Sequence, residues 1–234
     1  MKRIGPFSTK NDMELDYLEV VGPARIRHHL TIQEDVTITG PLNLSGILDV
    51  KKDIQINGPV SLNEGTITCK EELVIMGPFR NDGGKIEAEE LLINGPLNNL
   101  SDFPVKTTKI KVNGPLSSKS SLNIPSTLKI NGPVSCRDSI TAKNIVIRGP
   151  INMDGALVAT EKIEIILSCK NLSDDSLIEC EYIQANKIEI SCKTELSPFI
   201  EVDLKAPEIV LKNVRHKGAI EGNLTLIDDA THED

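Results

Sequence analysis

The amino-acid sequence predicts an all-β protein, a single-stranded parallel β-solenoid with triangular turns of about 18 residues and about twelve turns in all. Three observations predict this fold. The dipeptide Gly-Pro occurs nine times, at intervals of 17 to 19 residues. Aliphatic residues recur two apart at fixed positions before these pairs. The 234 residues include 29 isoleucines but only four Phe, two Tyr and no Trp, which indicates a core of thin, similar layers.

The strand before each glycine is the most regular predicted element. From Gly22 to Gly149, the residues four and two positions before the glycine are aliphatic in all sixteen cases. Because side chains alternate along a strand, residues two apart lie on one face. We therefore predict a strand with one buried face, formed by Leu18, Val36, Ile54, Leu73, Leu91, Ile110, Leu128 and Ile145 together with Val20, Ile38, Ile56, Ile75, Ile93, Val112, Ile130 and Ile147.

A second strand is predicted after each Gly-Pro pair. The position two residues after the glycine is apolar, and it holds Phe7, Ala24, Leu42, Val60, Phe79, Leu97, Leu116, Val134 and Ile151. The position four residues after the glycine is less regular, and it holds Thr9, Ile26, Leu44, Leu62, Asn81, Asn99, Ser118, Cys136 and Met153. Both positions are expected to point inward.

A third strand is predicted ten to eight residues before several glycines. Its inward pairs are Leu30/Ile32, Leu48/Val50, Ile67/Cys69 and Leu122/Ile124, and the pairs Ile86/Ala88 and Ile140/Ala142 are slipped by one residue. Each repeat then holds three strands of about six residues, which is one triangular turn. Stacked turns place like residues over like residues, about 4.8 Å apart.

The Gly-Pro pair has a local explanation. Glycine takes the positive φ that a sharp corner requires, and proline begins the next strand where its missing N–H costs least. Asparagine precedes the glycine four times, at Asn57, Asn94, Asn113 and Asn131. Because asparagine tolerates left-handed backbone, we expect these residues to adopt it at the corner.

Gly-Pro is absent after residue 150, but a shorter signature continues. Copies of small-x-x-aliphatic-x-aliphatic begin at Ala88 and Ala142 and recur at Ala159-Ile163-Ile165, Ala185-Ile188-Ile190, Ala206-Ile209-Leu211 and Gly222-Leu224-Leu226. The longer late intervals predict loops at Lys170–Asp175 and Glu195–Pro198. We predict one solenoid domain over 1–227, regular over 1–150 and irregular over 151–227, followed by an acidic tail over 228–234.

Composition argues against several classes of function. The net charge is −8 and the pI is about 5.1, whereas nucleic-acid binding needs a concentrated basic face. No apolar stretch approaches the 18 to 20 residues of a membrane span, and Met1-Lys2-Arg3 leads into Ile4-Gly5-Pro6 rather than a secretory signal. Five cysteines without close pairing favour a reducing cytoplasm over a disulfide framework.

Cysteines and histidines raise metal and catalytic interpretations. Cys69 and Cys136 fall in inward columns, and Cys169, Cys180 and Cys192 are eleven and twelve residues apart, so zinc-ligand spacing is absent. We expect buried small hydrophobic residues. The histidines are His28, His29, His216 and His232, and solvated surface is favoured over a general base. No phosphate-binding loop is recognised, so we predict no nucleotide, no cofactor and no metal.

Carboxylates are predicted to stack along one corner. They lie five and six residues before the glycine, at Asp16, Glu34, Asp35, Asp53, Glu71, Glu72, Glu89 and Glu90. Like charges at one-turn spacing repel unless solvent or a basic partner screens them. The simpler interpretation is a soluble corner that blocks lateral strand pairing. The other is a partner-binding edge centred on Glu71, Glu72, Glu89 and Glu90.

The heptapeptide Ile54-Gln55-Ile56-Asn57-Gly58-Pro59-Val60 and its copies resemble the bactofilins, polymer-forming bacterial cytoskeletal proteins with a right-handed parallel β-helix core. The resemblance covers most of residues 15–160. It implies nucleotide-independent assembly by end-to-end stacking, often at the membrane, in support of cell shape, wall synthesis or motility. This sequence departs in having a longer repeat region, no proline-rich disordered tails and no clear apolar membrane-anchoring tip, for which Ile4 and Phe7 are the only candidates.

A solenoid also has a physical reason to polymerise. Each end carries unpaired backbone and apolar columns unless a cap covers them. The first Gly-Pro pair comes at residue 5, which leaves no room for an N-terminal cap, and 222–234 lacks helical periodicity. We therefore expect polymerisation through ends that expose Ile4, Phe7, Leu18 and Val20, and Leu224 and Leu226.

The expected function is structural rather than enzymatic. The expected partners are further copies of the chain, a related paralogue, and membrane-associated or cell-wall proteins, with the polymer in the cytoplasm or at the inner face of the membrane. The alternative is a solenoid enzyme or ligand-binding module, acyltransferase-like or carbohydrate-binding, that uses a surface groove.

Overall fold

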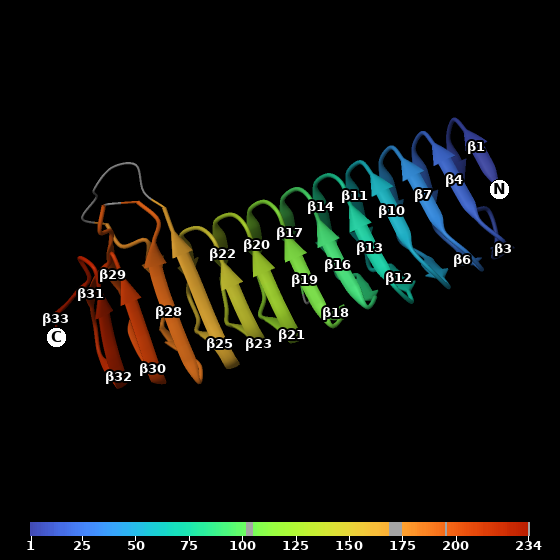
Figure 1. The fold of residues 1–234 in the computed structure, drawn as a ribbon. Helices are drawn as coiled ribbons and strands as arrows, with labels where there is room; N and C mark the ends of the chain where they lie inside the picture. The colour runs from blue at the N-terminus through green and yellow to red at the C-terminus, as the bar shows by residue number, and fades with distance from the viewer. Residues whose placement is uncertain (102–104, 169–174, 195, 234) are drawn as a thin grey trace. The chain divides into compact units, whose positions relative to one another are not determined.

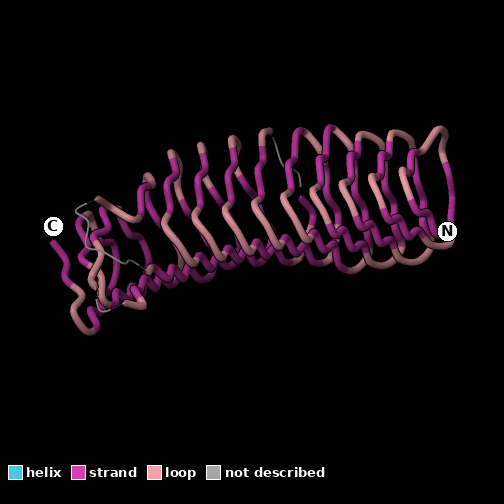
Figure 2. Tube along the Cα trace, turned by 90° about the horizontal axis from the view of Figure 1, so that it is seen from above, coloured by secondary structure: helices cyan, strands magenta, loops and turns pink. Residues whose placement is uncertain are grey.

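The structure, a computed structural model, describes residues 1–101, 105–168, 175–194 and 196–233 and divides into two compact units, 1–120 and 121–234. Every regular element in these described ranges is a β-strand, and short loops join the strands (Figure 2). The strands stack in parallel as a β-solenoid of about twelve turns, which confirms the predicted fold class. That the two units form one continuous domain stays a prediction.

Unit 1 stacks its described strands in three parallel sheets (Figure 1). The first sheet contains β1 (Lys2–Ile4), β4 (Leu18–Val21), β7 (Val36–Thr39), β10 (Ile54–Asn57), β13 (Glu72–Ile75), β16 (Glu90–Ile93) and β19 (Lys109–Val112). The second contains β2 (Phe7–Ser8), β5 (Ala24–Ile26), β8 (Leu42–Leu44), β11 (Val60–Asn63), β14 (Phe79–Asp82), β17 (Leu97–Asn99) and β20 (Leu116–Ser118). The third contains β3 (Met13–Leu15), β6 (His29–Ile32), β9 (Ile47–Val50), β12 (Thr66–Cys69), β15 (Lys85–Glu87) and β18 (Val105–Lys106).

The register places equivalent repeat positions side by side. In the first sheet Ile56 lies beside Ile38 and Ile75, as the aliphatic columns predict. All sixteen first-sheet positions of the pattern are buried. The strands themselves contain two to four residues rather than the predicted six, because corners occupy the rest of each turn.

The irregular column four residues after each glycine is also inward. Its apolar members are buried, and so are its polar members Thr9, Asn81, Asn99 and Ser118. The Asn81 side-chain amide donates to Asn99 Oδ1 at 2.8 Å, and Asn99 Nδ2 donates to Ser118 Oγ at 3.0 Å. Ser118 Oγ in turn donates to the Ser120 carbonyl at 2.7 Å. A chain of hydrogen bonds therefore satisfies polar groups inside the solenoid, where an unpaired group would be costly.

Close backbone contact explains the glycine column better than positive φ does. A Cβ built on Gly40, Gly58 or Gly95 would lie 2.4 to 2.5 Å from the carbonyl oxygen of the glycine one turn earlier. Gly22, Gly77, Gly114 and Gly149 are similarly obstructed, at 2.6 to 2.8 Å. Several corner glycines have positive φ, such as Gly5 at 99°, but Gly58 does not. The side chain is excluded because successive corners touch.

The asparagines before the glycines do not take the left-handed backbone that we predicted. Positive φ among the described non-glycine residues occurs at Glu64, Asn213 and Asp228 instead. The asparagine side chains form lateral contacts, since Asn113 Nδ2 donates to Asn94 Oδ1 at 2.5 Å. Their contribution is hydrogen bonding between turns.

In most described turns of unit 2, two strands join into one longer strand. The described strands of unit 2 are β21 (Leu122–Ile130), β22 (Val134–Cys136), β23 (Ile140–Ile147), β24 (Ile151–Met153), β25 (Leu157–Leu167), β26 (Ile178–Glu179), β27 (Tyr182–Gln184), β28 (Lys187–Cys192), β29 (Phe199–Glu201), β30 (Asp203–Lys212), β31 (Arg215–Lys217), β32 (Ile220–Ile227) and β33 (Thr231–Glu233). The exception is the turn in which β27 and β28 stay separate. Register shifts, such as the one between Ala142 and Asn144, mark where the third-sheet part of the strand bends into the first-sheet part. The predicted alanines Ala142, Ala159, Ala185 and Ala206 are buried at or beside these bends.

Two predictions concern the later part of the chain, namely the acidic tail and the loops. The predicted acidic tail is partly wrong, because β33 pairs in parallel with β31. Asn213 and Asp228 have φ of 52° and 56°, and they occupy the corners that follow the long strands β30 and β32. The predicted loops fall largely outside the described residues, since 170–174 and 195 are not described.

Candidate functional site

The N-terminal end of unit 1 differs from the prediction. Leu18, Val20 and Phe7 are 1%, 0% and 7% exposed, so their predicted exposure at this end is wrong. For Leu18 and Val20 the reason is that β1 pairs with β4 and places Arg3 beside Val20, so that one more turn covers their columns. Ile4, on the outer face of β1, is 77% exposed.

The C-terminal end of unit 2 is formed by β32 and β33. Leu224 and Leu226 continue the inward columns of Ile209 and Leu211. Leu224 is half-buried, whereas Leu226 is 44% exposed and the neighbouring Ile227 is 38% exposed. In the described chain β32 pairs with β30, and its other edge has no partner strand, as is also true of β1.

Two histidines meet at this end. His216 is 1% exposed, and its Nε2 lies 2.8 Å from the Val202 carbonyl oxygen, so Nε2 donates. Its Nδ1 lies 2.9 Å from His232 Nδ1, which places a single proton between the two nitrogens. Burial lowers the pKa of His216 most, and the charge of His232 lowers it further. The prediction of solvated histidines is confirmed for His28 and His29, which are exposed, and is wrong for His216.

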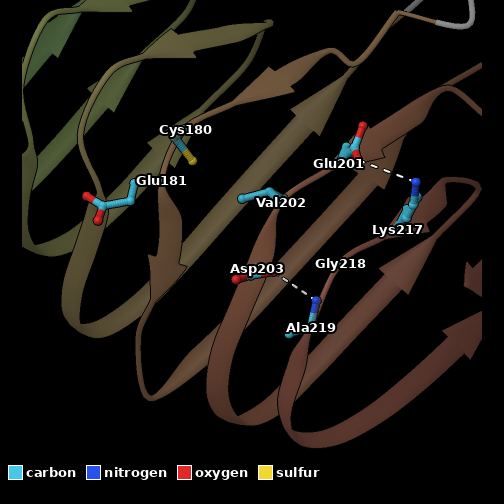
Figure 3. A pocket seen from close by; sticks show the side chains of 8 residues that line it. All are labelled: Cys180, Glu181, Glu201, Val202, Asp203, Lys217, Gly218 and Ala219. Carbon is cyan, nitrogen blue, oxygen red and sulfur yellow. Dashed lines mark hydrogen bonds and ion pairs between the residues drawn. The ribbon is translucent and has the colours of Figure 1, made fainter. Parts of the chain in front are cut away.

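A surface hollow in unit 2 is the candidate site for the alternative function (Figure 3). Its volume is about 520 Å³, and its lining includes Cys180, Glu201, Asp203 and Lys217. Glu201 forms an ion pair with Lys217 at 3.6 Å, and Asp203 Oδ1 accepts from the Ala219 amide at 2.8 Å. Burial raises the pKa of the Cys180 thiol to about 12, so this sulfur is protonated at neutral pH and is a poor nucleophile.

The other described cysteines also favour the packing interpretation. Cys69, Cys136 and Cys192 are buried, as predicted for Cys69 and Cys136 from the column pattern. Burial first, and then the charge of Asp53, raises the pKa of the Cys69 thiol to about 12. Cys169 lies outside the described residues.

The acidic edge lies at the corner between the third and first sheets of unit 1. Glu71 and Glu89 are exposed, and Glu72 and Glu90 are half-buried and adjacent in register. Glu90 forms an ion pair with Lys109 at 2.7 Å. Asp53 Oδ1 accepts from the Glu72 amide at 2.8 Å, so one carboxylate of the predicted column also caps the next turn.

Within the described ranges, no three His, Cys, Asp or Glu side chains gather as metal ligands, and no helix has the length and apolar character to cross a membrane. The chain was compared with protein-family models, curated proteins and solved structures, and none of them matches it.

Proposed function

We propose that this chain is a bactofilin-like structural protein that assembles end to end, without nucleotide, into filaments or scaffolds. The observation that carries the proposal is the pair of open sheet edges, β1 and β32, each with exposed aliphatic side chains beside it. Such edges are templates for pairing with another chain. Monomeric solenoid proteins usually cover them with a capping element.

Stacking two ends would satisfy the unpaired backbone groups of the edge strands and bury the exposed aliphatic side chains. The backbone groups of the two edge strands would pair, and Ile4, Leu226 and Ile227 would leave water. Burial of apolar area contributes about 25 cal/mol per Å², from which the entropy cost of association is subtracted. No bound nucleotide is required for this step.

Sedimentation velocity and negative-stain microscopy over a range of protein concentrations test the proposal. We expect wild type to form concentration-dependent filaments in the absence of nucleotide. Ile4→Arg and Leu226→Arg should reduce assembly at least tenfold while circular dichroism is unchanged. Thr39→Arg, on an exposed outer position within unit 1, is the matched control. Filaments of normal length from both end variants would reject end stacking and favour lateral association.

The role of such a polymer follows from the resemblance alone. It would support cell shape, the envelope or motility from the cytoplasm or the inner face of the membrane. Its partners would be other copies, a related paralogue, and membrane-associated or cell-wall proteins. Co-sedimentation of the purified polymer with vesicles of anionic phospholipid tests the membrane part of this role, and equal pelleting with and without vesicles would oppose it.

A second candidate, ligand binding, is favoured by the hollow around Glu201 and Lys217 (Figure 3). It would accommodate an acyl or carbohydrate ligand in an open groove. Thermal-shift measurements with acyl-CoA and oligosaccharide panels test it. A shift of the melting temperature that Lys217→Ala abolishes would support this function, and no shift with any panel member would oppose it.

A further inference from the structure

We propose that the acidic edge of unit 1 docks on the outer face of the second sheet of unit 1 in another copy, so that polymers associate side by side. The partner is a second copy of this chain. The inference rests on the proposed polymer and adds a lateral contact to its end-to-end contact. Charge, the repeat distance and the placement of the two surfaces within unit 1 carry it.

The outer face of the second sheet carries hydrogen-bond donors and cations. Its central row, followed turn by turn from β2 to β17, is Ser8, Arg25, Asn43, Ser61, Arg80 and Asn98. This row contains no carboxylate, although the net charge of the chain is −8. Beside the row lie the exposed cations Lys10 and Arg27 and the exposed carboxylate Asp82. The face is therefore cationic in balance.

The cations of this face have no partner within the part of the chain that the structure describes. There, no hydrogen bond or ion pair forms at the side chains of Lys10, Arg25, Arg27 and Arg80. Lys109 of the first sheet, in contrast, forms an ion pair with Glu90 at 2.7 Å. The guanidinium groups of the second sheet are thus available to carboxylates of another molecule, which arginine binds through two parallel N–H···O bonds.

The acidic edge offers carboxylates that are equally available. Four of them are exposed and form no side-chain hydrogen bond or ion pair among the described residues, namely Asp16, Glu34, Glu71 and Glu89. Lys52 and Lys70 lie at the same corner, so the edge is acidic in balance rather than uniformly acidic. Opposite net charge on the two surfaces favours their encounter and disfavours contact of either surface with its own kind.

The two surfaces also share one repeat distance. Successive turns lie about 4.8 Å apart, so carboxylates along the edge and donors along the face recur with the same period. Arg25 and Arg80 are three turns apart, and so are Asp16 and Glu71. Two parallel copies can therefore place both arginines opposite carboxylates at once. An extended peptide rises about 3.3 Å per residue and does not keep this match.

The two surfaces point in different directions within one copy. The acidic edge lies where the third sheet meets the first, and the second sheet takes no part in that corner. An edge therefore cannot reach the face of its own copy, and each docked copy leaves its own edge or face open. A contact between two different surfaces propagates from copy to copy. We infer a parallel array of polymers rather than a closed pair.

Salt separates this lateral contact from the end-to-end contact. Exposed ion pairs are screened at about 1 M salt, where the Debye length is about 3 Å, whereas backbone pairing and apolar burial persist. We expect wild type to form bundles at low salt and single filaments at high salt. Negative-stain microscopy measures the width, and low-speed sedimentation measures the bundled fraction. Bundles of unchanged width at about 1 M salt would contradict a charged contact.

A single charge reversal tests the face. Arg80→Glu should lower the bundled fraction at least fivefold and leave filament length unchanged. Lys85→Glu is the matched control, because Lys85 is also exposed and lies in the same turn, but on the third sheet. Equal bundling by the two variants would overturn the assignment of the second sheet.

Two complementary variants test that the edge and the face meet. The face variant carries Arg25→Glu and Arg80→Glu, and the edge variant carries Glu34→Lys, Glu71→Lys and Glu89→Lys. Each variant, assembled alone, should form single filaments at low salt. Mixing the two kinds of filament should restore at least half of the wild-type bundled fraction, because a basic edge then meets an acidic face. No recovery in the mixture would overturn the proposed pairing of surfaces.

The outcomes separate the two proposals. If wild type stays monomeric at all concentrations and salt levels, both the proposed function and the lateral contact fail. If wild type forms filaments that do not bundle at low salt, end-to-end assembly stands and the lateral contact is wrong. Salt-sensitive bundles that Arg80→Glu disperses and Lys85→Glu preserves support both proposals.

Discussion

Unit 1 and unit 2 build similar turns from different local chemistry. Unit 1 uses glycine at its corners and separates three short strands per turn. Unit 2 merges two strands in most of its described turns, and the corners after β30 and β32 use Asn213 and Asp228 in left-handed backbone. Their outer surfaces also differ. Unit 1 carries the acidic edge, whereas unit 2 carries ion pairs such as Lys162 with Glu164 and Glu189, at 3.3 and 2.5 Å.

The comparison indicates that the inward aliphatic columns define the fold, whereas different residue types can form the corners. Both units keep aliphatic residues at equivalent register positions, for example Ile54 beside Leu73 in unit 1 and Ile188 beside Ile209 in unit 2. A corner needs only a backbone that bends from one sheet to the next without a clash. Glycine meets this need where corners touch, and asparagine or aspartate meets it where they take left-handed φ.

The largest expected effect comes from a charge in the shared column. Ile56→Asp places a carboxylate between Ile38 and Ile75 in a position with no solvent exposure. We expect a loss of roughly 4 kcal/mol or more in unfolding free energy, because a buried unpaired charge is costly. Urea denaturation measures it. Gln55→Asp, on the exposed side of the same strand, is the control, and equal stability of the two variants would reject the assigned register.

The corner difference predicts the next largest effect. Gly58→Ala would bring a methyl group to 2.4 Å from the Gly40 carbonyl oxygen, and we expect a loss of about 3 kcal/mol. Asn213→Gly, at the corresponding corner of unit 2, should change stability by less than about 1 kcal/mol, because glycine also adopts left-handed φ. If both variants unfold at the wild-type urea concentration, corner contact is not what selects glycine.

A pH effect is expected from His216 in unit 2. Its folded pKa is lowered by burial from the ordinary value of 6.5, so below that pH the unfolded chain binds more protons than the folded one. Stability should therefore fall as pH drops below about 6.5, by at most about 1.4 kcal/mol per pH unit, and level off below the folded pKa. Melting temperatures of wild type and His216→Leu from pH 7.5 to 5 measure this, and identical slopes would contradict it.

Surface charge should give the smallest effect, and its sign should differ between the units. Lys162→Gln leaves Glu164 and Glu189 without their shared cation, and we expect a loss below about 1 kcal/mol that shrinks in high salt. Glu72→Gln relieves repulsion with Glu90 and should be neutral or slightly stabilising, within about 0.5 kcal/mol. A large loss from Glu72→Gln would place the acidic edge in a structural network instead.

Periodicity in the sequence was sufficient to predict the fold class and the buried columns, since a repeated pattern fixes register at every turn. It could not locate the end surfaces, because Arg3 continues an apolar column with a charged residue and so conceals the turn that covers Leu18 and Val20. The His216–His232 contact was missed for a similar reason. The Gly-Pro pattern ends at Gly149, and without a glycine at the corner before it β33 resembled a tail. The available signal was that Asn213 and Asp228 each follow the aliphatic pair of a predicted strand, where asparagine and aspartate tolerate a corner.

The Asn81–Asn99–Ser118 chain has a consequence for how unit 1 folds. Turns with nearly identical aliphatic columns can stack one repeat out of place, since Ile, Leu and Val are almost equivalent neighbours. A stack that omitted the turn of Asn81 would place Asn99 beside Leu62 and remove the amide that donates to Asn99 Oδ1. The three polar residues therefore distinguish their turns from the other, nearly identical turns and favour one register. They penalise kinetic traps in which the solenoid is one turn short, while the native stack loses nothing.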